Sequence, residues 1–546
     1  MEDPSRLAIY ERYRPIVDEW EPFFASLSRP LPPTIWHHPS RIAPAALVSW
    51  LAEDDIHLSA IPWYDGAFRW ASDKTPGQHI AYAAGLYHIQ EEASLLPVLL
   101  LDPQPGERIL DLCAAPGGKT AQIAFRLKSQ GTVIANDRSY ERLKSLSRTQ
   151  ERLGLTNLCM TLEDAANYPR DTRPFDRILA DVPCSCDGTV RKKRNQGLLR
   201  RLSLLSYESL GGLQTAILRK AVALCRPSGR IVYSTCSLAP EENERVIDTI
   251  LREFGPSLRL LPASLPSFRF SPGLTSWKGQ AFSPEIEKAL RVWPHHNDTG
   301  GFFAAILERT EIPFPPHFFR QRPAQRPSSV SASPLETPTS AAPQEPLASS
   351  LLSFPPLVPL PEDEGMSLSS ESSVLPSLAP TEGGASSWRI TQDGQPRLRL
   401  LEERFGLTPE VWASYSILAH NSDTMTIADK ALQPPTKPSS QIVGMSFLRI
   451  SQAYPKLTTA AALLLGSHAT KGFLELDEAR ALAYARRQDI EISDEESLPL
   501  PPRGYVLLRY RGFLLGLGLL RSESGKTLVE SAYPKAWALP PEDSGE

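Results

Sequence analysis

The chain has 546 residues, of which 41% are hydrophobic and 22% charged, and its formal net charge at pH 7 is −4. This length allows two to four domains, and the slightly acidic balance excludes a uniformly basic nucleic-acid-binding protein but not a local basic patch. Six cysteines form no disulfide framework, the start M-E-D-P-S has no secretory signal, and the apolar runs are too short for a bilayer, so we expect a cytoplasmic protein.

The first 75 residues mix helical periodicity with irregular segments. Helical patterns run through I-Y-E-R-Y-R-P-I-V-D-E-W (residues 9–20) and L-V-S-W-L-A-E-D (residues 47–54). We therefore expect a small N-terminal α+β domain over residues 1–75.

Short β runs alternate with helical stretches through residues 76–310. The four clearest runs are R-I-L-D-L (108–112), T-V-I-A-N-D (132–137), F-D-R-I-L-A-D (175–181) and G-R-I-V-Y-S-T (229–235), each followed by a turn. This order is typical of βαβ units and predicts an α/β domain with a mostly parallel sheet.

The composition changes after residue 310. Fifteen of the 52 prolines lie in residues 311–385, among serines, alanines and threonines, which predicts a disordered linker. The remaining residues, 386–546, regain periodicity and end in the β-rich piece G-Y-V-L-L-R-Y-R-G-F-L-L-G-L-G-L-L-R (504–521). They predict one or two small α+β units.

The stretch L-D-L-C-A-A-P-G-G-K-T (110–120) is the first candidate site. A β run ends at Asp111, and the glycines at 117 and 118 let the backbone of the following turn approach a ligand closely. The next strand ends at Asp137, where an acidic residue can accept both ribose hydroxyls. The pattern favours a nucleoside cofactor and leaves NAD open.

Two further strands end in cysteines, in D-V-P-C-S-C (181–186) and S-T-C-S (234–237). A cysteine after a strand is usually a small buried hydrophobic residue, and we assign Cys113, Cys159 and Cys225 that way. Cys184 and Cys186 could form a metal pair, but no second Cys or His pair has ligand spacing, so we expect no metal.

The motifs C-A-A-P-G-G-K-T, D-V-P-C and S-T-C-S resemble those of the Sun-type RNA (cytosine-5) methyltransferases. The resemblance implies a Rossmann-like sheet that binds S-adenosyl-L-methionine, preceded by an N-terminal RNA-binding domain. It also implies the residues that hold this cofactor. They are Cys113, Ala114, Ala115, Pro116, Gly117, Gly118 and Lys119 on the methionine and ribose side, Asp137 at the ribose, Asp164 at the adenine edge and Asp181 closing the pocket.

The same resemblance assigns the chemistry. Cys236 is the implied nucleophile that adds to carbon-6 of cytosine, and Cys184 assists release of the methylated RNA; DNA cytosine methyltransferases instead use the cysteine of a Pro-Cys motif as nucleophile. Asp181 is expected to hydrogen-bond the base, and Lys119 to orient the base or the cofactor. The family usually has glycine after Pro-Cys-Ser, and Cys186 in its place predicts a differently bent loop.

Basic residues follow this loop directly, in V-R-K-K-R (190–194). Beside a catalytic loop they are expected to neutralise RNA phosphates. The predicted RNA-binding residues are Arg191, Lys192, Lys193 and Arg194. The segment W-P-H-H-N-D-T-G-G-F-F-A-A-I-L (293–307) resembles the last motif of the family's catalytic domain, in which residues 298–303 are expected to pack beneath the active site.

The tail resembles the PUA-like region of the bacterial ribosomal RNA methyltransferases of the RsmF group, in E-R-F-G-L, A-Y-P-K-L, F-L-E-L-D-E-A and Y-P-K-A-W. We therefore expect a monomeric methyltransferase that acts on cytosine-5 of small-subunit ribosomal RNA, with catalytic domain 76–310 and PUA-like RNA-binding region 386–546. Transfer RNA is the alternative substrate. A non-catalytic, RNA-binding ribosome-assembly factor and a DNA methyltransferase are the rival functions.

Overall fold

The computed structural model describes residues 4–170, 173–192, 204–315, 389–390, 395–419, 423–449, 456–501, 503–523 and 525–541. The described residues before 316 and after 388 belong to one compact unit. Most of the predicted linker, from residue 316 onward, lies outside the described residues, so its disorder stays a prediction. Among the described residues, no helix is long and apolar enough to cross a membrane.

The N-terminal sheet has four antiparallel strands in the order β2-β3-β1-β4. Its strands are β1 (Thr34–His37), β2 (His57–Ala60), β3 (Ala67–Ala71) and β4 (Tyr87–Ile89), and its helices are α2 (Pro44–Glu53) and α3 (Ile80–Ala83). The sheet extends past the boundary predicted at residue 75, because β4 pairs with the central strand β1. This pairing places the end of the N-terminal domain near residue 90.

The first two helical segments pack away from this sheet. The 3-10 helix Pro4–Tyr13 and α1 (Trp20–Ser26) share a buried cluster with residues of the catalytic region. In this cluster the ring of Phe23 meets Trp293 edge-on at 5.6 Å between centroids, and Leu238 is fully buried. The start of the chain thus packs against the catalytic region, and its predicted RNA binding stays a prediction.

The central sheet of the catalytic domain has the strand order β11-β14-β15-β9-β8-β5-β6-β7-β19. Its five middle strands β9, β8, β5, β6 and β7 are all parallel, as the sequence predicts, whereas β14 and β15 are antiparallel additions. The strands are β5 (Arg108–Asp111), β6 (Thr132–Asn136), β7 (Leu158–Thr161), β8 (Phe175–Asp181), β9 (Cys225–Thr235), β10 (Leu258–Leu261), β11 (Ser271–Pro272), β14 (Leu290–Val292) and β15 (Phe302–Arg309), with the small hairpin β12 (Ser276–Trp277) and β13 (Gln280–Ala281) beside them.

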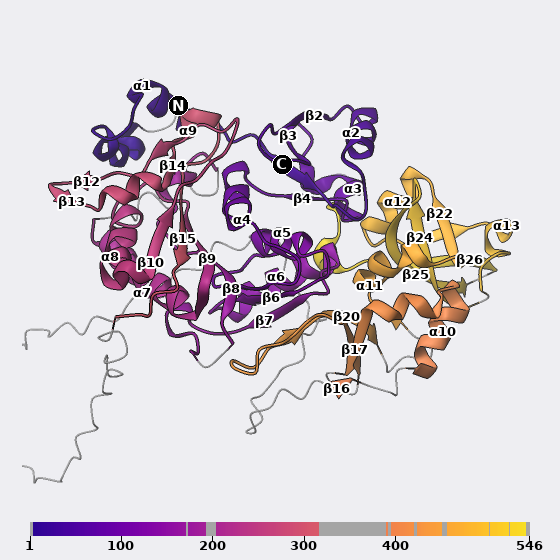
Figure 1. The fold of residues 1–546 in the computed structure, drawn as a ribbon. Helices are drawn as coiled ribbons and strands as arrows, with labels where there is room; N and C mark the ends of the chain where they lie inside the picture. Colours follow the sequence, from indigo (N-terminus) through magenta and orange to yellow (C-terminus); the bar gives the residue numbers. More distant parts are fainter. Residues whose placement is uncertain are drawn as a thin grey trace, which may run out of the picture. The chain divides into compact units, whose positions relative to one another are not determined.

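Helices cover the two faces of this sheet (Figure 1). On one face α4 (Leu96–Leu101) and α6 (Tyr140–Leu153) both contact α5 (Gly118–Arg126), while α7 (Leu204–Leu224) packs against α8 (Glu244–Phe254) on the other. Helix α6 shows why these segments are helical, since Ser139 caps its first turn and Gly154, at φ 68°, ends it. The short α9 (Pro294–Asn297) precedes β15.

The C-terminal region holds two five-stranded sheets, with the orders β16-β17-β18-β20-β21 and β22-β24-β25-β26-β23. The strands are β16 (Arg389–Ile390), β17 (Tyr415–Ala419), β18 (Thr424–Asp429), β19 (Ile442–Val443), β20 (Met445–Arg449), β21 (Lys456–Leu457), β22 (Phe473–Leu476), β23 (Ile490–Ile492), β24 (Gly504–Tyr510), β25 (Phe513–Glu523) and β26 (Lys526–Ser531). The helices are α10 (Gln395–Phe405), α11 (Thr459–Leu465), α12 (Glu478–Ala485) and α13 (Asp494–Ser497).

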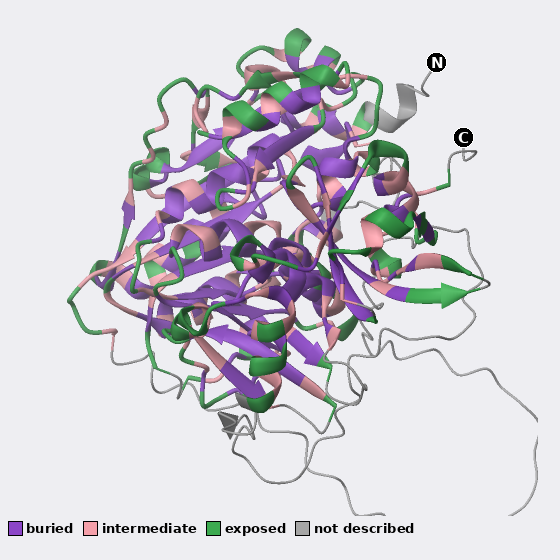
Figure 2. Ribbon diagram, turned by 90° about the vertical axis from the view of Figure 1, so that its right-hand side faces the viewer, coloured by how far each residue is buried: buried purple, intermediate pink, exposed green. Residues whose placement is uncertain are grey.

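The strand β19 joins the catalytic sheet by pairing antiparallel with its edge strand β7. Two buried contacts lie beside it, from Gln150 Nε2 to the Gly444 carbonyl at 2.8 Å and from Thr156 Oγ1 to Asp429 Oδ1 at 2.6 Å. Figure 2 shows buried residues concentrated in the sheet strands and exposed ones on outer helices and loops. The C-terminal region therefore covers the open edge of the catalytic sheet.

Candidate active site

The polar residues predicted from the sequence gather at the carboxyl edge of the parallel strands. Asp111 ends β5, Asp181 ends β8, and Cys236 follows β9 directly. Strand order reverses between β5 and β8, because the chain builds the sheet outward from β5 on both sides. Open α/β sheets bind ligands at this switch point.

The glycine-rich turn leads from β5 into α5. Gly117 takes a left-handed φ of 108° as the N-cap of α5, and a Cβ there would lie 3.2 Å from Leu146 and 3.3 Å from Thr149. A side chain at this position is disfavoured by both backbone and space. Glycine at 117 thus lets the turn pack closely against α6. The predicted contacts of residues 113–119 with the cofactor stay a prediction.

Asp111 is a member of the site that the sequence motif did not single out. Its Oδ2 accepts a hydrogen bond from Thr120 Oγ1 at 2.8 Å, while its buried Oδ1 makes no well-formed hydrogen bond among the described residues. Burial raises the pKa of Asp111 to about 7, and the hydrogen bond from Thr120 offsets only part of that rise. An apolar strand that ends in aspartate before a glycine-rich turn was the available signal.

Asp137 follows β6 and is almost fully buried. Its Oδ1 accepts a hydrogen bond from the Ser139 backbone N–H at 3.0 Å, and Arg142 Nη1 approaches its Oδ2 at 3.2 Å as an ion pair. Oδ2 otherwise makes no hydrogen bond within the described chain. An acceptor left open in this way fits a ribose hydroxyl.

Asp164 lies after β7 and is exposed. Its carboxylate accepts hydrogen bonds from the Ala166 backbone and from Asn167 Nδ2, at 3.1 and 2.6 Å, and so caps the short helix Ala165–Asn167. The predicted contact with the adenine edge stays a prediction. Burial raises the pKa of the Cys113 thiol well above its usual value, which suits a residue that contributes backbone and packing.

Asp181 and Lys119 form an ion pair at the centre of the site. Lys119 Nζ lies 2.7 Å from Asp181 Oδ2, and Ser234 Oγ donates to Asp181 Oδ1 at 2.7 Å. Although burial acts to lower it, attraction to Asp181 raises the pKa of Lys119 above its usual value. Lys119 is thus a fixed cation over the edge of the sheet, 5.8 Å from the Phe302 ring centroid.

The two predicted catalytic cysteines lie together. Cys184 Sγ and Cys236 Sγ are 3.3 Å apart, and both side chains are partly exposed. A hydrogen bond with Cys184 lowers the pKa of Cys236, but a hydrogen bond with Cys186 and burial outweigh it, so this pKa lies well above the usual value. In the resting protein Cys236 is therefore a thiol that needs assistance to ionise.

A third cysteine joins this pair. Cys186 Sγ lies 3.9 Å from Cys184 Sγ, and its backbone has the left-handed angles φ 60° and ψ 20°. Glycine takes this conformation freely, whereas a β-carbon makes it costly. Cys186 thus occupies a left-handed turn position, and the predicted difference in bend from the family's loop stays a prediction.

Glu242 braces the two cysteine loops against each other. Its carboxylate accepts hydrogen bonds from the Ser185 backbone N–H at 2.9 Å and from Ser237 Oγ at 2.6 Å, each next to a catalytic cysteine. Gln214 Nε2 adds a third hydrogen bond at 2.8 Å. Burial raises the pKa of Glu242 to about 7. No sequence motif pointed to this residue.

Asp187 has the same bracing role from the other side. It is fully buried, and its carboxylate accepts hydrogen bonds from the Leu238 backbone N–H at 2.7 Å and from the Tyr13 hydroxyl at 2.5 Å. Tyr10 donates to the Asp187 carbonyl. The N-terminal helical segment thereby helps to fix the loop that carries Cys184.

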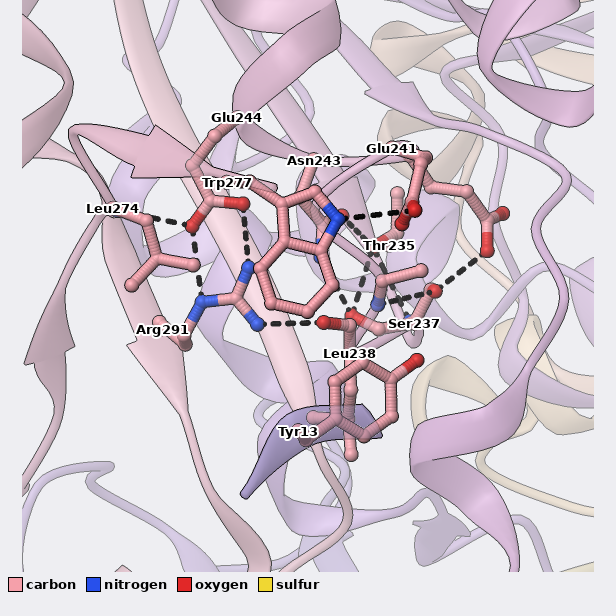
Figure 3. A network of polar contacts seen from close by, with 12 residues as sticks. Tyr13, Thr235, Ser237, Leu238, Glu241, Asn243, Glu244, Leu274, Trp277 and Arg291 are labelled. Atoms are coloured by element: carbon pink, nitrogen blue, oxygen red, sulfur yellow. Dashed lines mark hydrogen bonds and ion pairs between the residues drawn. The ribbon is translucent and has the colours of Figure 1, made fainter. Parts of the chain in front are cut away.

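The turn after Cys236 is held by a buried ion pair shown in Figure 3. Arg291 on β14 pairs with Glu244 at the start of α8, with Nε 2.9 Å from Oε1, and its Nη1 donates to the Leu238 carbonyl at 2.7 Å. Both charged side chains are at most 1% exposed. The position of the loop that carries Cys236 thus depends on this buried ion pair.

The basic segment after Cys184 differs from the prediction. The Arg191 guanidinium is buried and donates to the carbonyls of Arg29, Pro30 and Thr299 and to Asp298 Oδ1. These contacts are structural, so the predicted phosphate contact of Arg191 does not fit. Lys192 is partly exposed. Lys193 and Arg194 lie outside the described residues, and their role stays a prediction.

The predicted packing of residues 298–303 beneath the site is found. Gly301 donates its backbone N–H to the Gly188 carbonyl at 2.8 Å, and Gly188 donates to the Cys236 carbonyl at 3.0 Å. A Cβ on Gly188 would lie 2.5 Å from the Gly301 carbonyl and 2.8 Å from that of Cys236. The two catalytic loops and this segment therefore pack with backbone against backbone.

Comparison with known proteins agrees with this geometry. The profile of the family described as 16S rRNA methyltransferase RsmB/F matches residues 98–308. The ribosomal RNA small subunit methyltransferase F of Aeromonas hydrophila is 30% identical over 505 residues, which cover 91% of this chain and 90% of that protein. The chain belongs to the RsmB/F family.

Two profiles of the RsmF group match outside the catalytic domain, the RsmF N-terminal domain at residues 8–92 and the RsmF PUA domain at residues 471–539. The tRNA (cytosine(49)-C(5))-methyltransferase of Pyrococcus abyssi is 34% identical over 303 residues, covering 55% of this chain and 95% of that enzyme. A crystal structure described as a methyltransferase homolog from Pyrococcus horikoshii aligns at a TM-score of 0.50 with 30% identity, covering 56% of this chain and all of that one.

As an RsmB/F member, the protein is an S-adenosyl-L-methionine-dependent methyltransferase, and its residues fit this cofactor. The unsatisfied oxygen of Asp111 suits the cofactor's ammonium group, and the open acceptor of Asp137 suits its ribose. Gly117 itself is buried against Leu146 and Thr149, so packing of the turn onto α6 requires a glycine there. The open acceptors of Asp111 and Asp137 are the two observations that support the predicted pocket.

Proposed function

We propose that this RsmB/F protein methylates carbon-5 of a cytosine in small-subunit ribosomal RNA through a covalent adduct between Cys236 and the base. The observation that supports this most is the pair of thiols 3.3 Å apart, Cys184 and Cys236. They lie at the ends of neighbouring strands, beside the Lys119–Asp181 ion pair.

Cys236 acts as the nucleophile in this proposal. Carbon-5 of cytosine is a weak nucleophile, and addition of the Cys236 sulfur to carbon-6 makes carbon-5 electron-rich. When bound, the cofactor supplies an electrophilic methyl group on a sulfonium. Loss of the carbon-5 proton to a base then restores the double bond and expels the Cys236 thiolate.

Cys184 is proposed to assist both the start and the end of this sequence. Its hydrogen bond lowers the pKa of Cys236 and so favours the thiolate that attacks the base. The same proximity lets Cys184 exchange a proton with the departing sulfur when the methylated base is released. Without Cys184, the adduct is expected to persist.

Asp181 and Lys119 are proposed to select and orient cytosine. Asp181 can accept a hydrogen bond from the exocyclic amine, which uracil lacks, and can stabilise positive charge on the ring of the adduct. Lys119 holds the carboxylate in place at 2.7 Å. The base must leave its stack to reach them, at a cost of a few kcal/mol.

The length of the alignments favours ribosomal RNA over transfer RNA. The Aeromonas hydrophila relative, named for the small subunit, matches 91% of this chain. The Pyrococcus abyssi tRNA enzyme is covered almost completely by 55% of it. The C-terminal region is thus the part that distinguishes the two, and we propose that it, with Lys192, Lys193 and Arg194, supplies RNA contacts.

We further propose that the protein acts as a monomer in the cytoplasm. Its six cysteines are all free thiols, which suits a reducing compartment.

The test is methyl transfer from labelled S-adenosyl-L-methionine to purified small subunits, naked ribosomal RNA, transfer RNA and DNA, all unmodified at the site. Wild type is compared with Cys236→Ala, with Cys184→Ala and with the control Cys225→Ala, whose thiol is buried at the far end of β9. We expect 5-methylcytosine in ribosomal RNA from wild type and the control, none from Cys236→Ala, and a trapped protein–RNA adduct with Cys184→Ala.

The other outcomes separate the alternatives. Label in transfer RNA alone would replace the substrate and keep the chemistry. Label in DNA would refute the RNA assignment. Methylation by Cys236→Ala at the wild-type rate would refute the adduct with Cys236. The label would then come from a contaminating enzyme, and the non-catalytic assembly factor would become the favoured function.

A further inference from the structure

The catalytic site contains one more thiol than the proposed reaction uses. Cys186 occupies a left-handed position, with φ 60°, where glycine would be free of strain. In that position its sulfur lies 3.9 Å from Cys184 Sγ. The sulfur atoms of Cys184, Cys186 and Cys236 all lie within 4.8 Å of one another.

The spacing of these sulfurs matches that of thiolates around one metal ion. Zinc–sulfur bonds are about 2.3 Å long, which places two sulfurs of a tetrahedral site about 3.8 Å apart. The separations of 3.3 and 3.9 Å bracket that value. Three sulfur ligands from the protein and a water molecule in the fourth position would complete the coordination of such an ion.

The backbone around the three thiols is already ordered. Glu242 ties Ser185 to Ser237, and Asp187 ties the same loop to Leu238. A site held in this way loses little conformational freedom when it binds an ion. Sulfur ligands, rather than oxygen or nitrogen, select zinc and the other soft ions.

The titratable groups around the thiols are of both signs. Asp187 and Glu242 brace the loops that carry the thiols, Lys119 is engaged with Asp181, and Lys192 acts on Cys236. Two or three thiolates held this close together without a cation would repel one another. A divalent ion compensates the thiolates as it displaces their protons.

A second cluster of possible metal ligands in the described chain is less suited to a metal ion. Asp18, His295 and His296 also lie within 4.8 Å of one another. Arg269 Nη2, however, is 2.9 Å from Asp18 Oδ2 and 2.8 Å from Glu19 Oε2, so a cation already neutralises the carboxylates there.

We propose that Cys184, Cys186 and Cys236 bind a thiophilic ion of the zinc class, and that the occupied site is an inactive state of the enzyme. The three thiols lose their protons to solvent and form three sulfur–metal bonds, with no change in oxidation state. The ion holds the nucleophile and the release cysteine together, so neither can react with RNA. Only this inhibitory consequence rests on the proposed function; binding itself does not.

Binding is tested first without any substrate. The full chain, stripped of metal by a chelator and kept reduced with a phosphine, is titrated with Co²⁺ and with Cd²⁺, whose thiolate complexes have characteristic charge-transfer absorption. We expect one ion per chain. Loss of a ligand should weaken binding by at least about tenfold, since even indirect ligand partners change metal affinity by that much. That loss is expected for Cys186→Gly and Cys236→Ala, but not for the control Cys225→Ala.

Cys186→Gly is the sharpest variant because glycine takes the observed backbone angles without strain. Cys186→Ser is the second variant, and circular dichroism verifies the fold of each. Absence of the thiolate absorption in wild type, or equal affinity in wild type and both Cys186 variants, would overturn the site.

Inhibition is measured next, with Zn²⁺ against methyl transfer and each variant normalised to its own metal-free rate. We expect near-stoichiometric inhibition of wild type that a chelator reverses, and at least about tenfold more Zn²⁺ for the same effect in Cys186→Gly. Inhibition reversed by a reductant but not by a chelator would refute the metal and indicate a disulfide. Metal binding without methyl transfer to any RNA would refute the proposed function and leave the site standing.

Discussion

The ionisation of Asp111 predicts a pH-dependent affinity for the cofactor. Its carboxyl is buried at the end of β5, with one oxygen bonded to Thr120 and the other unsatisfied, and burial raises its pKa to about 7. The cofactor's ammonium group is expected to bind the ionised carboxylate only. Affinity should therefore increase as pH rises through 7, because binding must otherwise remove the proton from Asp111.

The size of this effect follows from the pKa. The ionised fraction of a group with a pKa of about 7 falls from about nine tenths at pH 8 to about one tenth at pH 6. The association constant should fall by the same factor of about ten, which is about 1.4 kcal/mol.

Calorimetric titration with S-adenosylhomocysteine at pH 6, 7 and 8 measures this change. The control is Asp111→Asn, which keeps an oxygen for Thr120 but has no proton to lose, so any titration of the ligand itself appears in both proteins. We expect weaker binding by the variant and a flat pH profile relative to wild type. An equal pH dependence in both proteins would refute the assignment of the proton to Asp111.

The ligand-free protein gives a second readout with the opposite sign. A carboxyl whose folded-state pKa is raised stabilises the fold below its unfolded pKa of about 3.9, and this contribution is lost as pH rises through about 7. Asp111→Asn should therefore gain thermal stability relative to wild type between pH 5 and pH 8. A difference in unfolding temperature that does not change over this range would contradict the raised pKa.

Three further variants test the residues that hold the loops of the site and the cation at its centre. Arg291→Met leaves the Glu244 carboxylate buried without its cation, so we expect a loss of about 3–5 kcal/mol in denaturant unfolding, largely recovered by adding Glu244→Leu. Lys119→Met removes the cation that we propose orients the base, and kcat should fall by about a hundredfold while circular dichroism stays unchanged. Tyr13→Phe removes one hydrogen bond to the buried carboxylate of the Cys184 loop; we expect about 1–2 kcal/mol of destabilisation, and no loss would show that this contact is dispensable.

The sequence predicted the catalytic sheet well, because its strands are short apolar runs bounded by turns. Four predicted strands correspond to β5, β6, β8 and β9, with boundaries that differ by at most one residue except at the start of β9. Their carboxyl ends carry the predicted residues for a reason of topology, since parallel strands point the same way. The local pattern and one general rule placed the cofactor turn and the two cysteines at strand ends, and the family resemblance supplied their roles.

The bracing residues could not be predicted in this way. Glu242, Asp187, Glu244 and Arg291 have ordinary surface residue types, and their partners lie on other elements. Arg191 is the opposite case. A run of basic residues normally predicts solvent-exposed side chains, whereas the structure buries Arg191 among backbone carbonyls. Burial of a charge depends on tertiary packing, which no spacing of residue types encodes.

The distance between Cys184 and Cys236 depends both on the strand ends, which the sequence predicts, and on the bracing residues, which it does not. Each cysteine follows a parallel strand, which fixes its position along the sheet, but the loops beyond the strands have no regular ladder of hydrogen bonds. Glu242 and Asp187 bind both loops from outside the strands, in addition to the bond between Gly188 and Cys236. Because buried acceptors are costly to leave unpaired, moving the loops apart would cost the bonds to both carboxylates. The thiol separation is therefore a property of the braced loops, and a change at either carboxylate should alter adduct formation and release together.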